Sequence, residues 1–181
     1  MTNYGMILPD PGFHAALREL TRRSGTLLVI DETHTLSNGP GGCTALQRLE
    51  LDLFVVGKAI GGGIPVGLYG ASEDVARRLW ALVPKVNPVK VRQSSHLGFG
   101  GTLAGNALSL AAMRATLESV LTEKAYERTI PLAKRFTEGV DRVIRERGLP
   151  WHVTRLGCRA EYWFCPEPPK NGSEAAAAVD A

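Results

Sequence analysis

Along the chain, short runs of apolar residues alternate with segments in which apolar residues recur at helical spacing. Short apolar runs with many branched side chains predict three buried strands: 26–30, 53–56 and 66–69. Apolar residues at helical spacing, together with capping residues at their ends, predict four helices: 11–24, 73–82, 103–121 and 129–147. Two more strands are expected at 153–156 and 160–164. The exchange of strands and helices is typical of an α/β fold.

Individual residues define several of these boundaries. Asp10 stands where an N-cap is expected and Pro11 at the first helical position, and Gly25 is placed to end that helix. Ser72 is the expected cap of the next helix. The stretch 83–101 lacks either period and predicts a long loop, a kind of segment that is often functional.

Both ends of the sequence interrupt this pattern. The last residues, PEPPKNGSEAAAAVDA, pass from a proline-rich loop into what resembles the opening of a helix. The start is also abrupt, because the sequence opens directly on a helix and a strand of an α/β pattern that is already under way. We therefore expect the chain to be a piece of a larger protein.

Composition excludes several classes of protein. Apolar content of 44 % and charged content of 22 % are ordinary for a globular protein, and the net charge of +3, without a run of five basic residues, argues against a nucleic-acid partner. The longest apolar runs are far shorter than the ~20 residues of a membrane span, and no secretory signal precedes them. Three widely spaced cysteines without a CxxC pair favour reduced thiols in a cytoplasm over disulfides or a metal site.

Charged residues directly follow two of the predicted strands. Asp31 comes after the first strand, and Lys58 follows the second and precedes the glycines 61–63. An acid in this position could simply face solvent, or it could belong to the magnesium site of a nucleotide hydrolase. The latter needs a G-x-x-x-x-G-K-[ST] loop, and the sequence has Asp52 in place of the first glycine and Ala59 after the lysine. A dinucleotide fingerprint fails as well, because Val66 stands where its third glycine belongs.

The two strand-end residues suggest a different chemistry. If the strands are parallel, Asp31 and Lys58 emerge at the same rim of the sheet, where open α/β folds bind ligands. An amine beside a carboxylate suits a pyridine cofactor that carries an aldehyde. The lysine would form the imine, and the aspartate would keep the ring nitrogen protonated, so that the ring acts as an electron sink. The glycines at 61–63 would leave room for backbone close to this cofactor.

Three segments carry a family resemblance: LLVIDETHT, FVVGKAIGGGIPVGLYG and GFGGTLAGNALSLAA. Together they resemble the class III aminotransferases that depend on pyridoxal 5'-phosphate (PLP), and among them the branch that contains glutamate-1-semialdehyde aminomutase. The resemblance implies a fold-type I large domain with a mostly parallel sheet and flanking helices, one antiparallel strand after the lysine, and a small C-terminal α+β domain. Residues 1–125 would belong to the large domain and 126–181 to the start of the small one.

The resemblance also implies roles for single residues. Lys58 would carry the cofactor as an aldimine and move the proton, and Asp31 would pair with the pyridinium nitrogen. Thr33 would pack on the ring face. Thr102, at the opening of the helix that follows, would bind the phosphate. In this family that threonine usually reaches the cofactor of the neighbouring subunit, so a homodimer with shared active sites is implied.

Three functions follow as hypotheses. The first is a transaminase that moves an amino group from an amino acid or amine to a keto acid or aldehyde. The second is a 2,1-aminomutase, which uses the same residues within one molecule, and the third is a fragment without activity. No metal spacing exists, so His34, His96 and His152 are expected to be structural or solvated. Arg159 could meet a substrate carboxylate or pair with Glu161.

Overall fold

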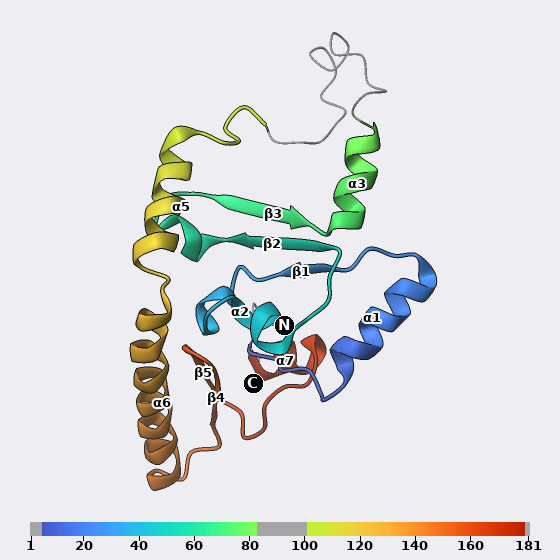
Figure 1. Cartoon of the computed structure of the whole chain (residues 1–181). Coiled ribbons are helices and arrows are strands. Elements are labelled where there is room, and N and C mark those ends of the chain that lie inside the picture. The colour runs from blue at the N-terminus through green and yellow to red at the C-terminus, as the bar shows by residue number, and fades with distance from the viewer. Residues whose placement is uncertain (1–4, 83–100, 180–181) are drawn as a thin grey trace.

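A three-stranded sheet forms the centre of the fold. We describe residues 5–82 and 101–179 of a computed structural model of the chain. The strands β1 (Val29–Asp31), β2 (Leu53–Gly57) and β3 (Gly67–Ala71) lie side by side in that order (Figure 1). β1 and β2 are parallel, and β3 is antiparallel to β2. The three predicted strands, the parallel pairing of the first two and the antiparallel strand after the lysine are confirmed.

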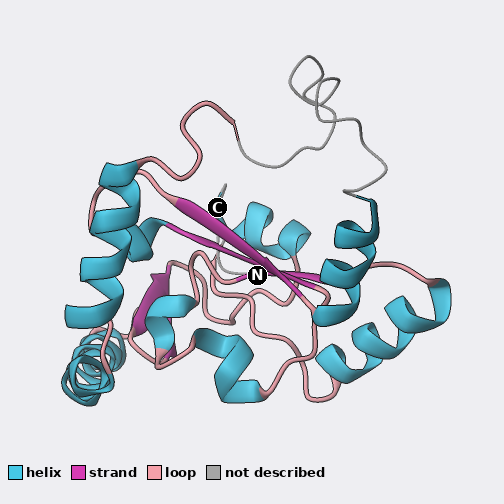
Figure 2. Cartoon of the chain, turned by 45° about the horizontal axis from the view of Figure 1, so that its top comes forward, coloured by secondary structure: helices cyan, strands magenta, loops and turns pink. Residues whose placement is uncertain are grey.

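Helices lie around this sheet (Figure 2). Their bounds are α1 Phe13–Ser24, α2 Gly42–Gln47, α3 Glu73–Leu82, α5 Ala107–Ser119, α6 Glu123–Glu146 and α7 Gly172–Val179, with short 3-10 turns η1 Leu36–Asn38 and η2 Lys58–Gly61. α1 and α3 lie near one end of the strands, and α5 lies at the opposite end, where β2 finishes (Figure 1). The expected α/β fold is therefore present.

Three helices differ from the sequence prediction at their starts. α1 begins at Phe13, because Gly12 in the left-handed conformation, φ 87°, is its N-cap, while Asp10 only closes a turn with its carbonyl. α5 begins at Ala107, because the Asn106 side chain accepts from the Ser109 N–H, and the residues before it form a turn. The prediction that a helix opens beside Thr102 is wrong for this reason.

α6 begins earlier than predicted. Pro131 favours a helix start nearby, since proline suits a first helical turn. The structure instead continues the helix through Pro131 and begins it at Glu123, where the Thr122 side chain accepts from the Ala125 N–H. The short helix α2 was not predicted, because its six residues are too few to show a helical period and directly follow the glycine- and proline-rich residues 39–41.

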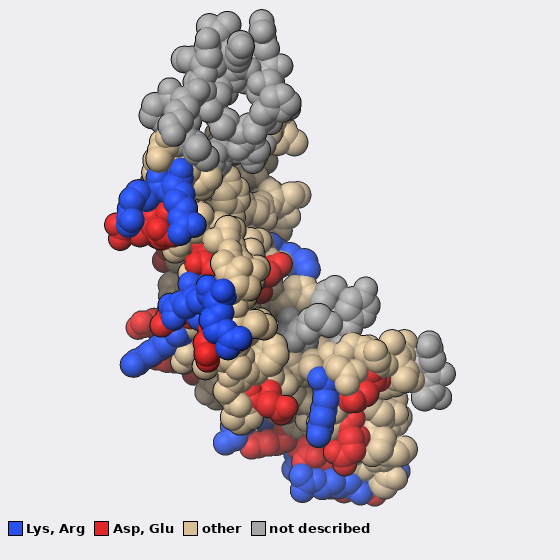
Figure 3. All heavy atoms as spheres, turned by 90° about the vertical axis from the view of Figure 1, so that its right-hand side faces the viewer, with Lys and Arg blue, Asp and Glu red and all other residues tan. Residues whose placement is uncertain are grey.

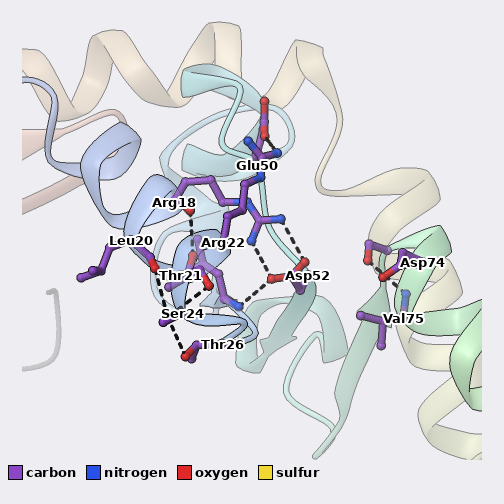
Figure 4. Close-up of polar contacts among 12 residues, drawn as sticks. Arg18, Leu20, Thr21, Arg22, Ser24, Thr26, Glu50, Asp52, Asp74 and Val75 are labelled. Atoms are coloured by element: carbon purple, nitrogen blue, oxygen red, sulfur yellow. Dashed lines mark hydrogen bonds and ion pairs between the residues drawn. The ribbon is translucent and has the colours of Figure 1, made fainter.

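An ion pair attaches α1 to the sheet (Figure 4). Arg18 donates from Nη1 to Asp52 Oδ2 at 2.6 Å and from Nη2 to Oδ1 at 3.0 Å. The Leu28 backbone N–H donates to the same carboxylate at 2.8 Å. These bonds, above all those from Arg18, lower the pKa of Asp52 to about 2. The ion pair thereby fixes the strand β1 that ends in Asp31 relative to its preceding helix.

A β-hairpin near the C-terminus packs against the loop that follows β1. The hairpin consists of β4 (His152–Leu156) and β5 (Arg159–Trp163), which confirms the two strands predicted there. At its turn, the Cys158 N–H donates to the Asn38 carbonyl at 3.3 Å. The Tyr126 hydroxyl, from α6, donates to the Leu36 carbonyl at 2.9 Å. The C-terminal part of the chain therefore supports the loop beside the strand end, and a domain division at about residue 125 stays a prediction.

The described residues bury few large apolar side chains. Val56, Ile60 and Val75 are buried, but Val29 is 51 % exposed and Leu27 46 % exposed. The prediction that the first strand is buried is wrong for the described part of the chain, since nothing in the described ranges covers that part of the sheet. Phe13 and Leu20, on the predicted apolar face of α1, are also exposed.

Charged side chains of both signs lie next to one another on the surface (Figure 3). Ion pairs along single helices account for much of this mixing, such as Arg78 with Asp74 on α3 and Arg23 with Glu19 on α1. This distribution agrees with the absence of a basic run in the sequence. Within the described ranges, no helix combines the length and apolarity that crossing a membrane requires.

Candidate active site

The carboxyl ends of β1 and β2 meet at one rim of the sheet. β1 ends at Asp31, which lies opposite Val55, and β2 ends at Gly57 directly before Lys58. Lys58 has a φ of 49°, a left-handed conformation that is uncommon for a residue with a side chain. Such a backbone costs roughly 1 kcal/mol or more, and it persists only where the surroundings impose it. The rim therefore presents the lysine from a constrained position.

A cavity of about 490 Å³ lies at this rim. Three of the predicted site residues line it: Asp31, Thr33 and Lys58. The remaining polar part of its wall includes His34, Glu32 and Cys43, and apolar side chains from α1 and β4 close other sides. Thr102 is exposed, stands in the turn before α5 and is not part of this wall. The structure thus brings together three of the four predicted residues.

Asp31 is held as a carboxylate. The Thr33 N–H donates to Asp31 Oδ1 at 2.8 Å. The pKa of Asp31 is lowered, first by a hydrogen bond from the Thr33 side chain, then by that backbone bond, and less by electrostatic interaction with His34 and Lys58. Partial burial opposes this effect. Thr33 therefore supports the charge of Asp31, and its predicted packing on a cofactor ring stays a prediction.

Glu32 fixes the loop after β1. Its side chain is completely buried and accepts from the Cys43 N–H at 3.2 Å and from the Thr44 hydroxyl at 2.5 Å, and also from the Thr44 N–H and the Thr35 hydroxyl. The carboxylate thus satisfies free N–H groups at the N-terminus of α2, where negative charge is favourable. A Cβ on Gly42 would lie 2.5 Å from Glu32 Oε2, so glycine is required there. The sequence showed Glu32 only as the neighbour of Asp31, because the helix that it caps was not predicted.

His34 lies against the lysine. Its Nε2 is in hydrogen-bond contact with Lys58 Nζ, and both side chains line the cavity. Sequence reasoning placed His34 among the structural or solvated histidines. The contact between His34 and Lys58 could not be predicted from the sequence, because the two residues follow different strands and lie 24 positions apart.

The glycines after Lys58 serve packing within the protein. A Cβ on Gly61 would lie 2.5 Å from Val66 Cγ1, and one on Gly62 would lie 2.7 Å from Thr116 Oγ1 of α5. The Ser109 hydroxyl, also on α5, donates to the Pro65 carbonyl at 2.9 Å. The space beside Gly61 and Gly62 is thus occupied by Val66 and α5, whereas nothing lies within 4 Å of a Cβ on Gly63, and the role of these glycines beside a cofactor stays a prediction.

The other candidates lie outside this cavity. Arg159 donates from Nε to Glu161 at 2.9 Å, which confirms the pairing considered for it. His152 Nδ1 contacts the Cys165 carbonyl at 2.7 Å, and His96 lies outside the described residues. In the part of the chain that the structure describes, no group of His, Cys, Asp and Glu side chains is arranged to hold a metal ion.

Comparisons with known proteins agree with this arrangement. Residues 1–158 match the family described as "Aminotransferase class-III". Over 167 residues the chain is 40 % identical to a glutamate-1-semialdehyde 2,1-aminomutase of Thermomicrobium roseum, and the match covers 92 % of this chain and 36 % of that enzyme.

Solved structures give the same result. A variant of a glutamate-1-semialdehyde aminomutase from Pseudomonas aeruginosa PAO1, in complex with PMP, is 53 % identical with a TM-score of 0.90, covering 98 % of this chain and 39 % of that one. An omega-transaminase from Sphaerobacter thermophilus is 29 % identical with a TM-score of 0.74, covering 98 % and 37 %.

The chain spans a little over a third of the length of these relatives. Within that span, the family match over residues 1–158 and the TM-score of 0.90 agree on one family and one fold. The predicted fold-type I architecture is therefore confirmed, and the chain belongs to the class III aminotransferases.

Proposed function

We propose that the protein containing this chain uses PLP to transfer amino groups. One observation carries the proposal. Asp31 and Lys58, at the ends of neighbouring parallel strands, line a single cavity, and Asp31 is held in its charged form. An anion and a primary amine on one cavity wall are the two groups that a pyridine aldehyde needs.

The residues present fit this cofactor. In the strand register, Lys58 lies three residues beyond the partner of Asp31, or ~10 Å along the strand. A pyridine ring with its aldehyde carbon, together with the reach of a lysine side chain, can bridge that separation. Among the described residues lining the cavity, none is an arginine and the only lysine is Lys58. The phosphate is therefore assigned to Thr102 and to groups outside this wall, as the resemblance implies.

Each residue then has a definite task. Bound PLP supplies the electron sink that stabilises negative charge on a substrate carbon. Asp31 accepts the ring N–H and holds that proton in place. Lys58 would hold the aldehyde carbon through Nζ, and the same amine would move the proton at the reacting carbon of the substrate. Thr33 keeps Asp31 ionised through its two hydrogen bonds.

The comparisons favour the 2,1-aminomutase as the specific activity. The relatives at 34–40 % identity are named glutamate-1-semialdehyde 2,1-aminomutases, as is the structural neighbour at 53 % identity. This reading replaces the transaminase as the first hypothesis. The transaminase remains the second candidate, because the omega-transaminase at 29 % identity shares the fold over 98 % of this chain.

Product analysis separates the two activities. The full-length protein, loaded with PLP, is given glutamate-1-semialdehyde alone, and in parallel an amino donor such as alanine with a keto-acid acceptor. Conversion of the semialdehyde to 5-aminolevulinate without an acceptor supports the mutase. Stoichiometric release of a keto acid from the donor in the second reaction, with no turnover in the first, supports the transaminase. Lack of turnover in both reactions would refute amino transfer.

We further propose that the active protein is a homodimer. The turn that carries Thr102 and the helix α5 after it expose several leucines: Leu103, Leu108, Leu110 and Leu117. A partner subunit that covers them would also bring its own cofactor towards Thr102. Replacing Thr102 by valine should then weaken PLP binding in the full-length dimer while its sedimentation coefficient stays unchanged.

A further inference from the structure

The contact between His34 and Lys58 is not explained by the tasks assigned above. His34 Nε2 meets Lys58 Nζ inside the cavity that also contains Asp31. Asp31 lies within electrostatic reach of both groups, because His34 and Lys58 each contribute to lowering its pKa, after the hydrogen bonds from Thr33. The other titratable side chains on the cavity wall are His14, Glu32 and Cys43.

The backbone that carries His34 is fixed from several sides. The Glu32 carbonyl accepts from the Thr35 N–H at 3.0 Å and from the Leu36 N–H at 2.8 Å, which closes a tight turn around His34. The carbonyl of His34 itself accepts from the Ser37 hydroxyl at 3.3 Å. The buried Glu32 carboxylate attaches this turn to α2. The imidazole therefore projects from a rigid loop.

The backbone of Lys58 is fixed as well. Its left-handed φ of 49° lies between the end of β2 and the turn η2, and Ile60 in that turn is buried. α5 holds the segment that follows, through Ser109 and Thr116. Because both backbones are fixed, the contact has to order only the side chains, chiefly the rotamers of Lys58, so the position at which Nζ meets the imidazole is preorganised.

We propose that His34 is a positioning residue for Lys58, whose imidazole hydrogen-bonds the lysine amine and aims it into the cavity. The inference rests on the proposed function, since it assigns to His34 the orientation of the amine that takes up PLP. A flexible lysine side chain has many rotamers, and a fixed partner selects the one from which Nζ can reach the aldehyde carbon. Orientation of a reacting group in this way raises the rate of capture.

The test uses the full-length protein freed of PLP. PLP is added, and the rate at which borohydride-stable label appears on Lys58 is measured by peptide mass spectrometry, so the readout does not depend on turnover. His34→Leu removes the hydrogen bond and keeps the bulk, whereas His34→Gln keeps a polar partner. His152→Gln, a histidine replacement on β4 away from this cavity, is the matched control. Thermal unfolding of each PLP-free variant is recorded alongside.

We expect His34→Leu to slow labelling of Lys58 by about 10-fold or more. His34→Gln should restore most of the rate, and His152→Gln should leave it unchanged, with similar unfolding temperatures throughout. Labelling of His34→Leu at the wild-type rate would overturn the inference. Equal loss in His34→Leu and His34→Gln, accompanied by a lower unfolding temperature, would overturn it in favour of a purely structural role. If the unaltered protein itself acquires no label on Lys58, the proposed function fails instead.

Discussion

At the scale of single residues, the site depends on how each charge is stabilised. The hydrogen bonds from Thr33 stabilise the carboxylate of Asp31 and lower its pKa. Lys58 is presented by an unusual backbone conformation and contacts His34. Glu32, the neighbour of Asp31 in sequence, is buried and fixes the loop after β1. Adjacent carboxylates thus have different tasks, one towards the cavity and one towards the fold.

Replacing Lys58 tests the attachment of the cofactor. Lys58→Ala in the full-length protein should abolish both the shifted absorbance of bound PLP and its fixation by borohydride. The fold should persist, because only a reactive amine at an exposed strand end is removed. Circular dichroism and peptide mapping check both points. Labelling of Lys85 or Lys90 in the unaltered protein would contradict the assignment.

Replacing Asp31 tests the orientation of the ring. Asp31→Asn preserves the shape but cannot hold a proton on the ring nitrogen. We expect proton removal from substrate to slow on the order of 100-fold or more, while PLP affinity falls less. Single-turnover kinetics with deuterated substrate measures the first quantity, and titration of the PLP-free protein measures the second. A kinetically silent substitution would show that the ring nitrogen does not face Asp31.

At the scale of elements, two attachments hold the strand end in place. The Arg18–Asp52 pair fixes α1 against the beginning of β1 and β2. The hairpin β4–β5 supports the loop after β1 through the contact of its turn with Asn38. Each attachment joins segments far apart in the sequence, and each can be removed by one substitution.

The Arg18–Asp52 attachment predicts a pH dependence of stability. The pKa of Asp52 is lowered from 3.8 to about 2 in the folded protein. Its contribution is therefore fully present above about pH 4 and is lost as the pH falls through about 2. Asp52→Asn should lower the free energy of unfolding by roughly 1–3 kcal/mol at pH 7. Urea unfolding of both proteins at several pH values tests this, and a difference that stays constant down to the acid limit would contradict it.

The hairpin contact predicts a difference between two glycine substitutions. Gly157 has a φ of 59°, and a Cβ there would lie 1.8 Å from the Asn38 carbonyl oxygen. Gly148 has nearly the same φ, 60°, with nothing within 4 Å. Both changes to alanine carry a similar backbone strain of about 1 kcal/mol, but only Gly157→Ala adds the clash. Gly157→Ala should therefore lower the unfolding temperature clearly more than Gly148→Ala. Equal effects would contradict this prediction, because they would show that the hairpin turn can shift away from Asn38 at no cost.

At the scale of the whole molecule, the chain exposes much apolar surface. The exposed side chains include Val29 and Tyr69 on the sheet, Leu108 on α5 and Phe136 on α6. Side chains of α6, such as Leu132, and of the hairpin region, such as Phe164, together line an apolar groove of about 950 Å³. Surfaces of this kind are usually covered by another part of a protein or by a partner.

This surface predicts how the 181 residues behave when expressed alone. The isolated chain should bind PLP weakly, show no measurable amino transfer and dissolve poorly. Asp31, Thr33 and Lys58 are the proposed partners of the cofactor on the cavity wall, and each missing charge-assisted hydrogen bond to the phosphate costs roughly 1.5–3 kcal/mol. PLP titration and assays with alanine or glutamate, beside the full-length protein, test this. Micromolar binding with turnover by the isolated chain would contradict it.

Local patterns in the sequence were sufficient for a substantial part of this picture. They predicted the strands, the hairpin strands and the ends of helices at glycine or beside Ser72, because periodicity and capping act over a few neighbouring residues. They also singled out Asp31 and Lys58 as candidates, since each stands at the carboxyl end of a predicted strand, and the two strands pair in parallel in the structure. The family resemblance rested on the same short segments.

Only the tertiary structure decided which distant groups meet. The cap that Glu32 forms on α2, the contact of His34 with Lys58 and the packing of α5 on Gly62 join residues between 10 and several tens of positions apart. The starts of α1, α5 and α6 were missed for a different reason, since several residues near each start could cap the helix and the structure selects Gly12, Asn106 and Thr122. Sequence periodicity reports which face of an element is apolar, whereas the partner of each polar side chain depends on the path of the whole chain, and so the chemistry of the rim became visible only once the strands were assembled.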